Sequence, residues 1–262
     1  MKGADQYANP SRMQNWKFTF GTFRRSAYVA LMRLNRFLAS AGLGSRRGVE
    51  EIIRTGRVKI NGRVVTELAT EVGSEDSVKV GSRVLKTEPP LTAVLFKPQG
   101  FVCSADDELG RRTIFELLPQ NWPRTYHVGR LDRESEGLLL VTNDGQLALS
   151  LTHPRFKIEK EYEVRIDKPI EPAHREKLLR GFQIIGGRAK AESVTVVSPQ
   201  LLRIVLMQGI KRQIRLMLYE LGYEVVRLCR IRIGTLKAGK LRPGDWRLLT
   251  PREFDSLRTG KS

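Results

Sequence analysis

Cysteine is scarce in this chain of 262 residues, because Cys103 and Cys229 are the only two. Two cysteines are too few for the disulfide framework that stabilises many secreted domains, and their low number is typical of proteins from a reducing compartment. We interpret both thiols as small core residues. The sequence therefore predicts a cytoplasmic protein whose fold does not depend on disulfide bonds.

Histidine and long apolar runs are rare as well. His127, His153 and His174 are the only three histidines, and they show no metal-ligand spacing with each other or with the cysteines. We therefore expect no structural zinc and no other metal. No stretch approaches the roughly 20 consecutive apolar residues that a membrane-spanning helix requires, so a membrane is not an expected partner.

Acidic residues are too few to balance the basic ones. The chain has 46 Lys and Arg against 28 Asp and Glu, which gives a formal net charge of +18. Cationic side chains gain affinity for a polyanion by releasing the counterions that its phosphates hold. An anionic membrane surface and a merely solvated basic surface are the alternative explanations, but the missing apolar span favours nucleic acid.

Residues 1–31 show no clear apolar period and a basic bias with a single acidic residue, Asp5. Transit peptides have this bias, and so does sequence that precedes a true start codon when translation is assigned too far upstream. Met32 would then be the true start, because a regular module begins there. We expect a disordered or dispensable extension. Its basic residues are Lys2, Arg12, Lys17, Arg24 and Arg25.

From Met32 onward the apolar residues follow regular periods. Those from 34 to 41 recur at helical spacing and predict a first helix, which the glycines that follow would end. Ser45 is suited to cap a second helix, and Gly56 is suited to end it. Asn61-Gly62 then separates two short strand-like runs, which favours a hairpin with a two-residue turn. The predicted order is helix, helix, hairpin.

This segment also carries a local excess of basic residues, because only Glu50 and Glu51 are acidic between residues 33 and 63. A solvated surface does not require so one-sided a charge. The basic residues are Arg33, Arg36, Arg46, Arg47, Arg54, Arg57, Lys59 and Arg63.

The segment from Met32 to about Leu85 resembles the S4-type RNA-binding domain. The shared features are Leu-Asn-Arg-Phe-Leu-Ala in the first helix, Ser-Arg-Arg at the start of the second, and Val-Lys-Ile-Asn-Gly in the hairpin. The resemblance implies that the helix pair and the hairpin grip structured RNA through its phosphates and shape. The expected RNA-binding residues of this module are Arg33, Arg36, Arg46, Arg47, Arg54 and Lys59.

A polar stretch that ends in Pro89-Pro90 has the composition of a linker. We therefore place the N-terminal domain at 32–88, a second domain at 89–255 and a tail at 256–262. Strands and helices in the second domain do not alternate strictly, which predicts an α+β fold with a mixed, largely antiparallel sheet and a central cleft. The expected strands are 91–96, 137–142, 162–166 and 201–206, and the expected helices are 114–118, 146–151, 172–179 and 212–221.

The most informative run is residues 128–145, Val-Gly-Arg-Leu-Asp-Arg-Glu-Ser-Glu-Gly-Leu-Leu-Leu-Val-Thr-Asn-Asp-Gly. It predicts a charged turn that leads into a buried strand, which an Asn-Asp-Gly turn ends. Asp132 lies in the charged turn between Arg130 and Arg133, and either cation favours its ionised form. An aspartate in such a turn is usually a cap or a surface ion partner, so the pattern alone does not assign catalysis.

The same run resembles the catalytic signature of the rRNA pseudouridine synthase family typified by the RsuA, RluB, RluE and RluF enzymes. These enzymes carry Gly-Arg-Leu-Asp, then Thr or Ser, Glu-Gly-Leu-Leu and Thr-Asn-Asp-Gly, and Gly129 distinguishes them from the related branch that generally has His there. The other family motifs match Lys97-Pro98-Gln99-Gly100 with Arg112-Thr113, then Lys160-Glu161-Tyr162, and finally Gly-Ile-Lys-Arg-Gln-Ile-Arg at 209–215 with Leu228-Cys229-Arg230.

The resemblance implies an enzyme that detaches uracil from its ribose and rejoins it through carbon 5. The reaction changes no oxidation state, so no cofactor is expected. Asp132 would be the essential carboxylate, Tyr162 would stack on the base, and Arg215 would pair with Asp132. Without the resemblance, Tyr162 fits an ordinary half-buried strand residue and Arg215 a solvated helix residue.

The resemblance also implies contacts with the RNA around the target. Arg130 would help to extrude the uridine from its stack, whereas Lys211 and Arg212 would contact phosphates. The partner is then ribosomal RNA or a ribosomal precursor. No exposed heptad pattern suggests a dimer, so we expect a monomer.

The target RNA and two other functions remain alternatives. Gln208-Gly209 and residues 223–225 are more similar to RluF-type enzymes, which favours large-subunit (23S-type) rRNA over small-subunit (16S) rRNA. The other functions are a non-catalytic rRNA-binding assembly factor and a hydrolase with Asp132 and Glu136 as an acid/base pair. Phe96 and Leu216 stand where many family members have a polar residue and a second Arg, which leaves the exact uridine open.

Overall fold

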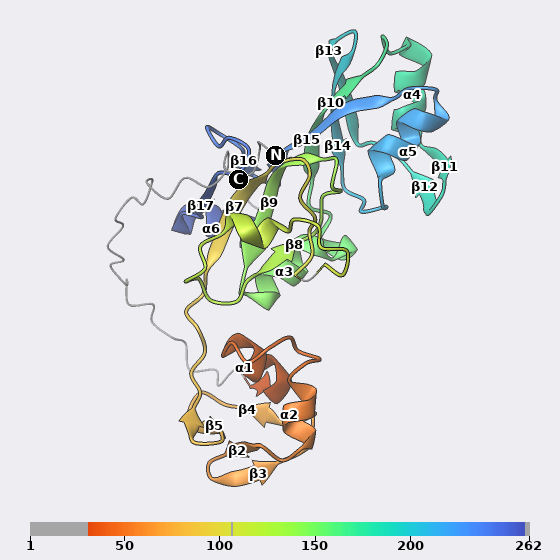
Figure 1. The fold of residues 1–262 in the computed structure, drawn as a ribbon. Helices are drawn as coiled ribbons and strands as arrows, with labels where there is room; N and C mark the ends of the chain where they lie inside the picture. Colours follow the sequence, from red (N-terminus) through yellow and green to blue (C-terminus); the bar gives the residue numbers. More distant parts are fainter. Residues whose placement is uncertain (1–30, 106, 260–262) are drawn as a thin grey trace. The chain divides into compact units, whose positions relative to one another are not determined.

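The computed structural model describes residues 31–105 and 107–259, which form two compact units (Figure 1). The smaller unit ends at Pro90 and the larger one begins at Leu91. Apart from Leu31, the expected N-terminal extension lies outside the described residues. In the part of the chain that the structure describes, no helix is long and apolar enough to cross a membrane.

The smaller unit packs two short helices against strands around one core of buried apolar side chains, among them Leu34, Leu38, Ile53 and Val58. Its main sheet has the strand order β3-β2-β5-β6, and β1 pairs with β4 beside α1. The elements are β1 (Met32–Arg33), α1 (Leu34–Ser40), α2 (Glu50–Arg54), β2 (Val58–Ile60), β3 (Arg63–Val65), β4 (Glu71–Val72), β5 (Val78–Val80) and β6 (Arg83–Val84).

The local signals read from the sequence have visible physical roles here. Asn61 and Gly62 have φ angles of 49° and 83°, the left-handed pair that a two-residue hairpin turn requires. The Ser45 hydroxyl accepts a hydrogen bond of 3.0 Å from the Gly48 amide. Ser45 therefore caps the turn that leads into α2, and the regular helix begins at Glu50.

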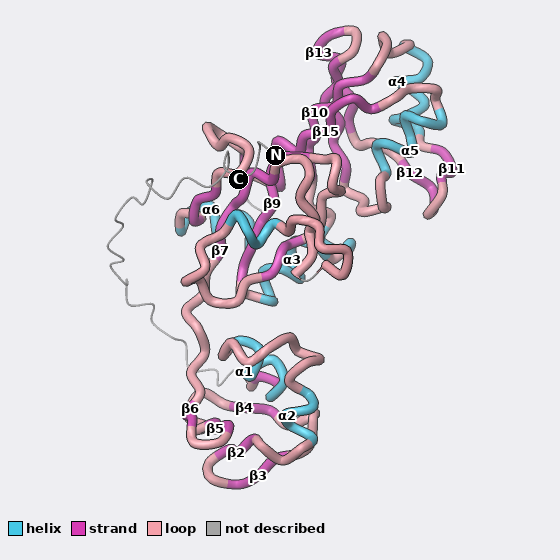
Figure 2. Tube along the Cα trace, in the orientation of Figure 1, coloured by secondary structure: helices cyan, strands magenta, loops and turns pink. Residues whose placement is uncertain are grey.

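In the described part of the larger unit, nine strands form one sheet with the main order β13-β14-β10-β15-β9-β7-β17 (Figures 1 and 2). All neighbouring strands are antiparallel except β15 and β9, so the expected mixed, largely antiparallel sheet is confirmed. The strands are β7 (Thr92–Lys97), β8 (Tyr126–Val128), β9 (Glu136–Thr142), β10 (Lys160–Ile166), β13 (Ser193–Ser198), β14 (Leu201–Leu206), β15 (Val225–Ile233), β16 (Leu236–Lys237) and β17 (Trp246–Leu248).

Strand β9 is buried along its whole length because both of its faces are covered. Leu138 and Leu140 pack in one cluster with residues of α3 (Gly145–Thr152) and α6 (Pro251–Thr259). Leu139 and Val141 pack in another with the segment around the 3-10 helix η2 (Ile114–Leu117). The uninterrupted apolar run of β9 follows from this two-sided burial.

The other half of the sheet packs on α4 (Pro172–Arg180) and α5 (Gln213–Glu220), through residues such as Val164, Ile204 and Leu218. A separate two-stranded hairpin, β11 (Phe182–Ile184) and β12 (Gly187–Ala189), follows α4 and lies beside α5 (Figure 2).

Three expectations need correction. The predicted helix at 114–118 is only the 3-10 helix η2, because Leu118 precedes a proline and is extended. Helix α5 begins after Arg212, which has a left-handed backbone with φ 57°. Helix α6 continues to Thr259 and buries Leu257 in the core, so residues 256–259 belong to the larger unit and not to a tail. A further short 3-10 helix, η3 (Pro154–Phe156), follows α3.

Candidate active site

Asp132 lies in the loop between β8 and β9, which we call the Asp132 loop (residues 129–135). Its side chain is 30% exposed, whereas the neighbouring Leu131 and Ser135 are buried. The loop is therefore anchored on both sides of the aspartate, and the carboxylate itself stays accessible.

A buried lysine supports this loop from behind. Lys97, at the end of β7, has no exposed surface, and its ammonium donates hydrogen bonds to the carbonyl oxygens of Pro98 (3.0 Å), Asp132 (3.1 Å) and Ser135 (2.7 Å). Burial lowers the pKa of Lys97 to about 8, because it disfavours the charged form. Lys97 was read from the sequence only as part of a motif, and nothing in the strand pattern indicates its three carbonyl partners.

Further backbone contacts hold the same loop. The Gly100 amide donates to the carbonyl of Arg133 at 2.8 Å. The Leu131 amide and carbonyl both contact the Cys103 sulfur at 3.4 Å, and burial raises the pKa of that thiol. Cys103 is thus half-buried and packed against the loop, and Cys229 is buried, which agrees with two free thiols in the interior.

Two arginines of the α5 region approach the loop from the other side. The Arg212 guanidinium lies 3.8 Å from Asp132 Oδ2 and 3.0 Å from Glu134 Oε2. Arg215 donates instead to the carbonyl oxygens of Glu134 (3.2 Å) and Val225 (3.1 Å), and burial lowers its pKa. Its Nε is buried and has no hydrogen-bond partner among the described residues.

The arrangement differs from the expected pairing of Arg215 with Asp132. Within the described residues, the ion pair of Asp132 is with Arg212, while Arg215 fixes the backbone of the loop. Arg212 has a left-handed backbone and therefore precedes α5, whereas Arg215 belongs to the helix itself. The structure thus brings Asp132, Arg212 and Arg215 together, with Arg212 as the ion partner of Asp132 and Arg215 bound to the backbone of the loop.

Tyr162 is half-buried on β10, where a register shift occurs between Glu161 and Tyr162. Its pairing partner in β15 is Arg230, and Arg230 in turn lies opposite Gly137 at the start of β9. Tyr162 is therefore two strands away from the strand that the Asp132 loop enters. Bulges of this kind often re-aim a side chain beside an active site.

Gly137 is required by this sheet geometry. Its φ is 109°, and a Cβ at this position would lie 2.3 Å from the carbonyl oxygen of Arg230. Arg230 is itself buried and donates from Nε to the carbonyl of Leu138 at 2.6 Å. The close approach of β9 and β15 therefore explains the glycine of the Glu-Gly-Leu-Leu run.

Glu136 is not placed as a free acid. Its carboxylate is buried and accepts a hydrogen bond from Arg227, which also forms an ion pair with Glu163. The structure gives no support to the acid/base pair of the hydrolase alternative.

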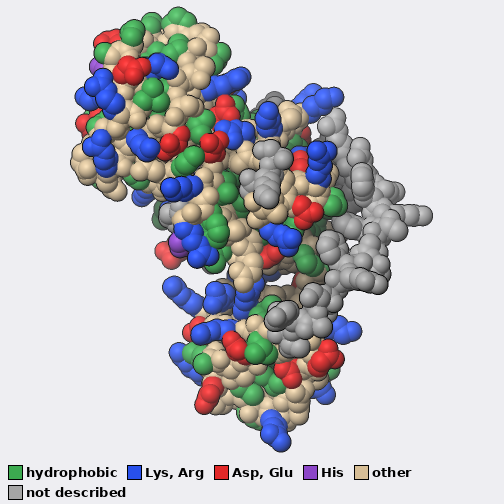
Figure 3. All heavy atoms as spheres, turned by 180° about the vertical axis from the view of Figure 1, so that it is seen from behind, with side chains coloured by type: hydrophobic (Ala, Val, Ile, Leu, Met, Phe, Trp, Pro, Cys, Tyr) green, Lys and Arg blue, Asp and Glu red, His purple; other side chains and the backbone are tan. Residues whose placement is uncertain are grey.

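The expected RNA-binding residues lie at the surfaces of both units, over which Lys and Arg are widely spread (Figure 3). In the larger unit, Arg130, Lys211 and Arg212 are exposed. In the smaller unit only Arg36 is half-buried, and the exposed residues are Arg33, Arg46, Arg47, Arg54 and Lys59. No group of three or more His, Cys, Asp or Glu within the described residues is arranged to hold a metal ion.

Comparison with known proteins identifies the family. Residues 92–220 match the RNA pseudouridylate synthase model, and residues 32–78 match the S4 domain. The chain is 37% identical over 233 residues to the ribosomal large subunit pseudouridine synthase B of Bacillus subtilis, covering 86% of this chain and 95% of that protein. It is 36% identical over 242 residues to the protein of the same name from Xylella fastidiosa, covering 87% of this chain and 51% of that protein.

A solved structure agrees with these matches. The crystal structure of a pseudouridylate synthase superposes with a TM-score of 0.64 at 30% identity, covering 86% of this chain and 99% of that one. The chain belongs to the RNA pseudouridylate synthase family, with an N-terminal S4 domain. It is an intramolecular isomerase that acts on RNA, which confirms the family and the enzyme class expected from the sequence.

Proposed function

We propose that this enzyme converts a specific uridine of large-subunit rRNA to pseudouridine, with Asp132 as the essential carboxylate. One observation supports the catalytic assignment above the others. The buried Lys97 ammonium donates three hydrogen bonds to backbone carbonyls and so fixes the loop that presents the partly exposed Asp132. The names of the Bacillus subtilis and Xylella fastidiosa relatives support the choice of large-subunit rRNA.

The reaction breaks the bond between ribose carbon 1′ and uracil N1 and forms a bond from carbon 1′ to carbon 5. The uracil N1 gains a proton and carbon 5 loses one, so the atoms balance without an oxidant or a cofactor. Asp132 acts as the nucleophile or the charged partner at the sugar or the base. Tyr162 stacks on the detached uracil and keeps it from leaving while it turns.

The arginines then have separate tasks. Arg212 lies 3.8 Å from the Asp132 carboxylate and presents its charge to RNA phosphate, and Arg215 positions the loop through the Glu134 carbonyl at 3.2 Å. Arg130 helps to displace the target uridine, and Lys211 contacts phosphate. The S4 domain supplies affinity for the rRNA through Arg33, Arg36, Arg46, Arg47, Arg54 and Lys59.

The test uses purified full-length protein with transcribed large-subunit and small-subunit rRNA. We expect the native chain to form pseudouridine at one site of the large-subunit transcript, and Asp132→Asn, which keeps the shape of the side chain, to form none while still binding. Modification of the small-subunit transcript alone would move the target to that RNA. Binding without pseudouridine by the native chain would favour an assembly factor, and release of free uracil would favour a hydrolase.

A further inference from the structure

The β11–β12 hairpin stands outside the large sheet of its unit as a separate two-stranded ribbon. Ile184 is buried and anchors the hairpin, whereas the next residue, Ile185 at the tip, is 80% exposed. Gly186 and Gly187 complete the turn with φ angles of 101° and 128°. A single exposed isoleucine is common on protein surfaces, so its surroundings decide whether it has a role.

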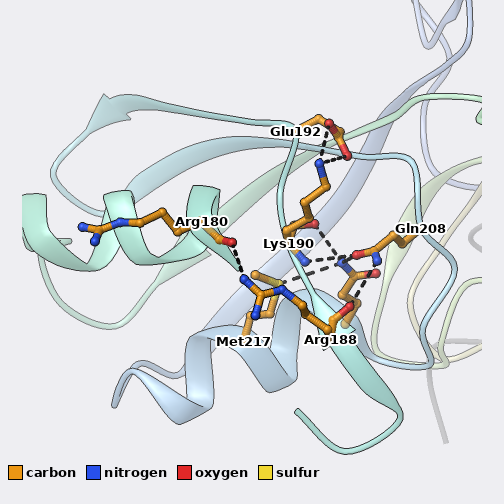
Figure 4. A network of polar contacts seen from close by, with 7 residues as sticks. Arg180, Arg188, Lys190, Glu192, Gln208 and Met217 are labelled. Atoms are coloured by element: carbon orange, nitrogen blue, oxygen red, sulfur yellow. Dashed lines mark hydrogen bonds and ion pairs between the residues drawn. The ribbon is translucent and has the colours of Figure 1, made fainter. Parts of the chain in front are cut away.

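Two buried or half-buried amides clasp the hairpin to the start of α5 (Figure 4). The Gln208 side chain donates to the Arg188 carbonyl at 3.1 Å and accepts from the Lys190 amide at 3.0 Å. The Gln213 side chain, 3% exposed, donates to the Lys190 carbonyl at 3.1 Å and to Gln208 Oε1 at 2.9 Å. Three of these hydrogen bonds reach the backbone of Arg188 and Lys190, and the fourth joins the two side chains, so together they hold the end of the hairpin.

The clasp places the hairpin tip next to the segment that reaches Asp132. A Cβ at Gly186 would lie 3.1 Å from Ile210 Cγ2, so the tip packs on Ile210. Two residues later, the Arg212 guanidinium lies 3.8 Å from Asp132. One short segment therefore contacts the hairpin tip at Ile210 and the Asp132 carboxylate at Arg212.

The charge around the hairpin suits a phosphate backbone. Exposed cations lie on the hairpin, at the end of α4 and on the segment before α5, and the acidic partners there are Glu192, 3.2 Å from Lys190, and Glu134, 3.0 Å from Arg212. Ion pairs this exposed exchange readily for a phosphate. The cations are Arg180, Arg188, Lys190, Lys211 and Arg212.

We propose that the β11–β12 hairpin is an RNA-binding element of the larger unit, in addition to the S4 domain, which is the smaller unit. Arg188 and Lys190 bind phosphates of the strand beside the target uridine, and Ile185 packs as an apolar wedge against a base that is unstacked when the uridine is extruded. Aliphatic wedges of this type stabilise an opened stack by covering the exposed face of a base. This inference rests on the proposed function, because it takes rRNA as the substrate.

The experiment compares full-length variants in equilibrium binding to transcribed large-subunit rRNA over a range of salt concentrations. We expect Ile185→Asp to weaken binding about tenfold, since an acid at the tip repels phosphate and loses the apolar contact, and Ile185→Ala to weaken it less. Arg188→Gln should also weaken binding and reduce the slope of log affinity against log salt by about 1. Unchanged thermal melting would show that the exposed substitutions leave the fold intact.

Matched controls lie on the large sheet of the same unit: Val196→Asp on β13, where Val196 is 42% exposed, and Arg203→Gln on the neighbouring strand β14. They should bind like the native chain. If Ile185→Asp and Arg188→Gln also bind like the controls, the hairpin is not an RNA contact and the inference is overturned. Binding can be measured without any reaction. A native chain that forms no pseudouridine in this rRNA would therefore contradict the proposed function, whereas the binding affinities of the variants would still decide whether the hairpin contacts RNA.

Discussion

The two sides of the candidate active site are built in different ways. Behind Asp132, the loop is held by the buried Lys97 ammonium and by the half-buried Cys103 sulfur. Facing it, Arg212 and Glu134 form an ion pair whose side chains are 40% and 59% exposed. Exposed pairs contribute only about 0–1 kcal/mol, so RNA phosphate can displace Glu134 at little cost.

This difference separates two kinds of function. In the proposed mechanism, the buried side fixes the position of the Asp132 carboxylate, and this position governs the rate of the chemical step. The exposed side would offer cations to the RNA, and these govern binding. We therefore expect substitutions behind Asp132 to lower kcat and substitutions on the α5 side to raise KM.

Lys97→Met should have the largest effect on the rate. Methionine fills a similar volume but donates no hydrogen bond, so the carbonyls of Pro98, Asp132 and Ser135 lose their common partner. We expect kcat to fall on the order of 100-fold because the carboxylate is displaced. Single-turnover rates at saturating enzyme measure this, and an unchanged rate with weaker binding would break the distinction between the two sides.

Gly137→Ala tests the sheet that supports the loop. The added Cβ would meet the Arg230 carbonyl at 2.3 Å, so β9 and β15 must separate. We expect the free energy of unfolding in urea to fall by about 3 kcal/mol or more. Gly239→Ala is the control: its φ is also positive, at 58°, but no atom lies within 4 Å, and it should cost only about 1–2 kcal/mol. Equal losses in both variants would contradict the close approach.

The depressed pKa of Lys97 predicts how stability changes with pH. The folded protein loses this proton at a pH of about 8, and the unfolded chain only near the ordinary value of 10.5. The unfolded chain therefore binds more protons in that window. The destabilisation caused by the buried charge is fully present below pH 8 and becomes smaller as the pH rises. The free energy of unfolding should rise by about 2 kcal/mol between roughly pH 7 and pH 9.5, relative to Lys97→Met. A flat difference would mean that the ammonium is not desolvated.

Arg212→Gln should have the smallest effect, and mainly on binding. We expect KM for rRNA to rise about fivefold and the salt dependence of binding to weaken by about one phosphate contact, with a smaller change in kcat. Steady-state kinetics at several salt concentrations measure both, with Arg203→Gln as the control. A fall in kcat at constant KM would instead place Arg212 with the rate-determining groups.

Several parts of the fold and of the candidate site could be predicted from the sequence because their signals are local. The Asn61-Gly62 turn needs only two residues with positive φ, and the apolar run of β9 needs only continuous burial. The charged turn that carries Asp132 was likewise visible in the order of residues. Such features depend on neighbours in the chain and not on the assembled sheet.

Other parts depend on partners that are distant in sequence. Strand β15 was not predicted because arginines interrupt its apolar pattern, but Arg227 and Arg232 pair with glutamates of neighbouring strands, and Arg230 binds the Leu138 carbonyl. The left-handed backbone at Arg212 and its ion pair with Asp132 could not be predicted either, because a non-glycine residue gives no sign of a positive φ in the sequence. These interactions exist only once the strands have assembled.

The most direct test of the central claim is chemical mapping of pseudouridine in both rRNAs from cells that lack this protein, complemented with the native chain or with Asp132→Ala. We expect one large-subunit site to lose its pseudouridine in these cells and only the native chain to restore it. If every site persists, or if Asp132→Ala restores the lost site equally well, Asp132 is not the catalytic carboxylate of this protein.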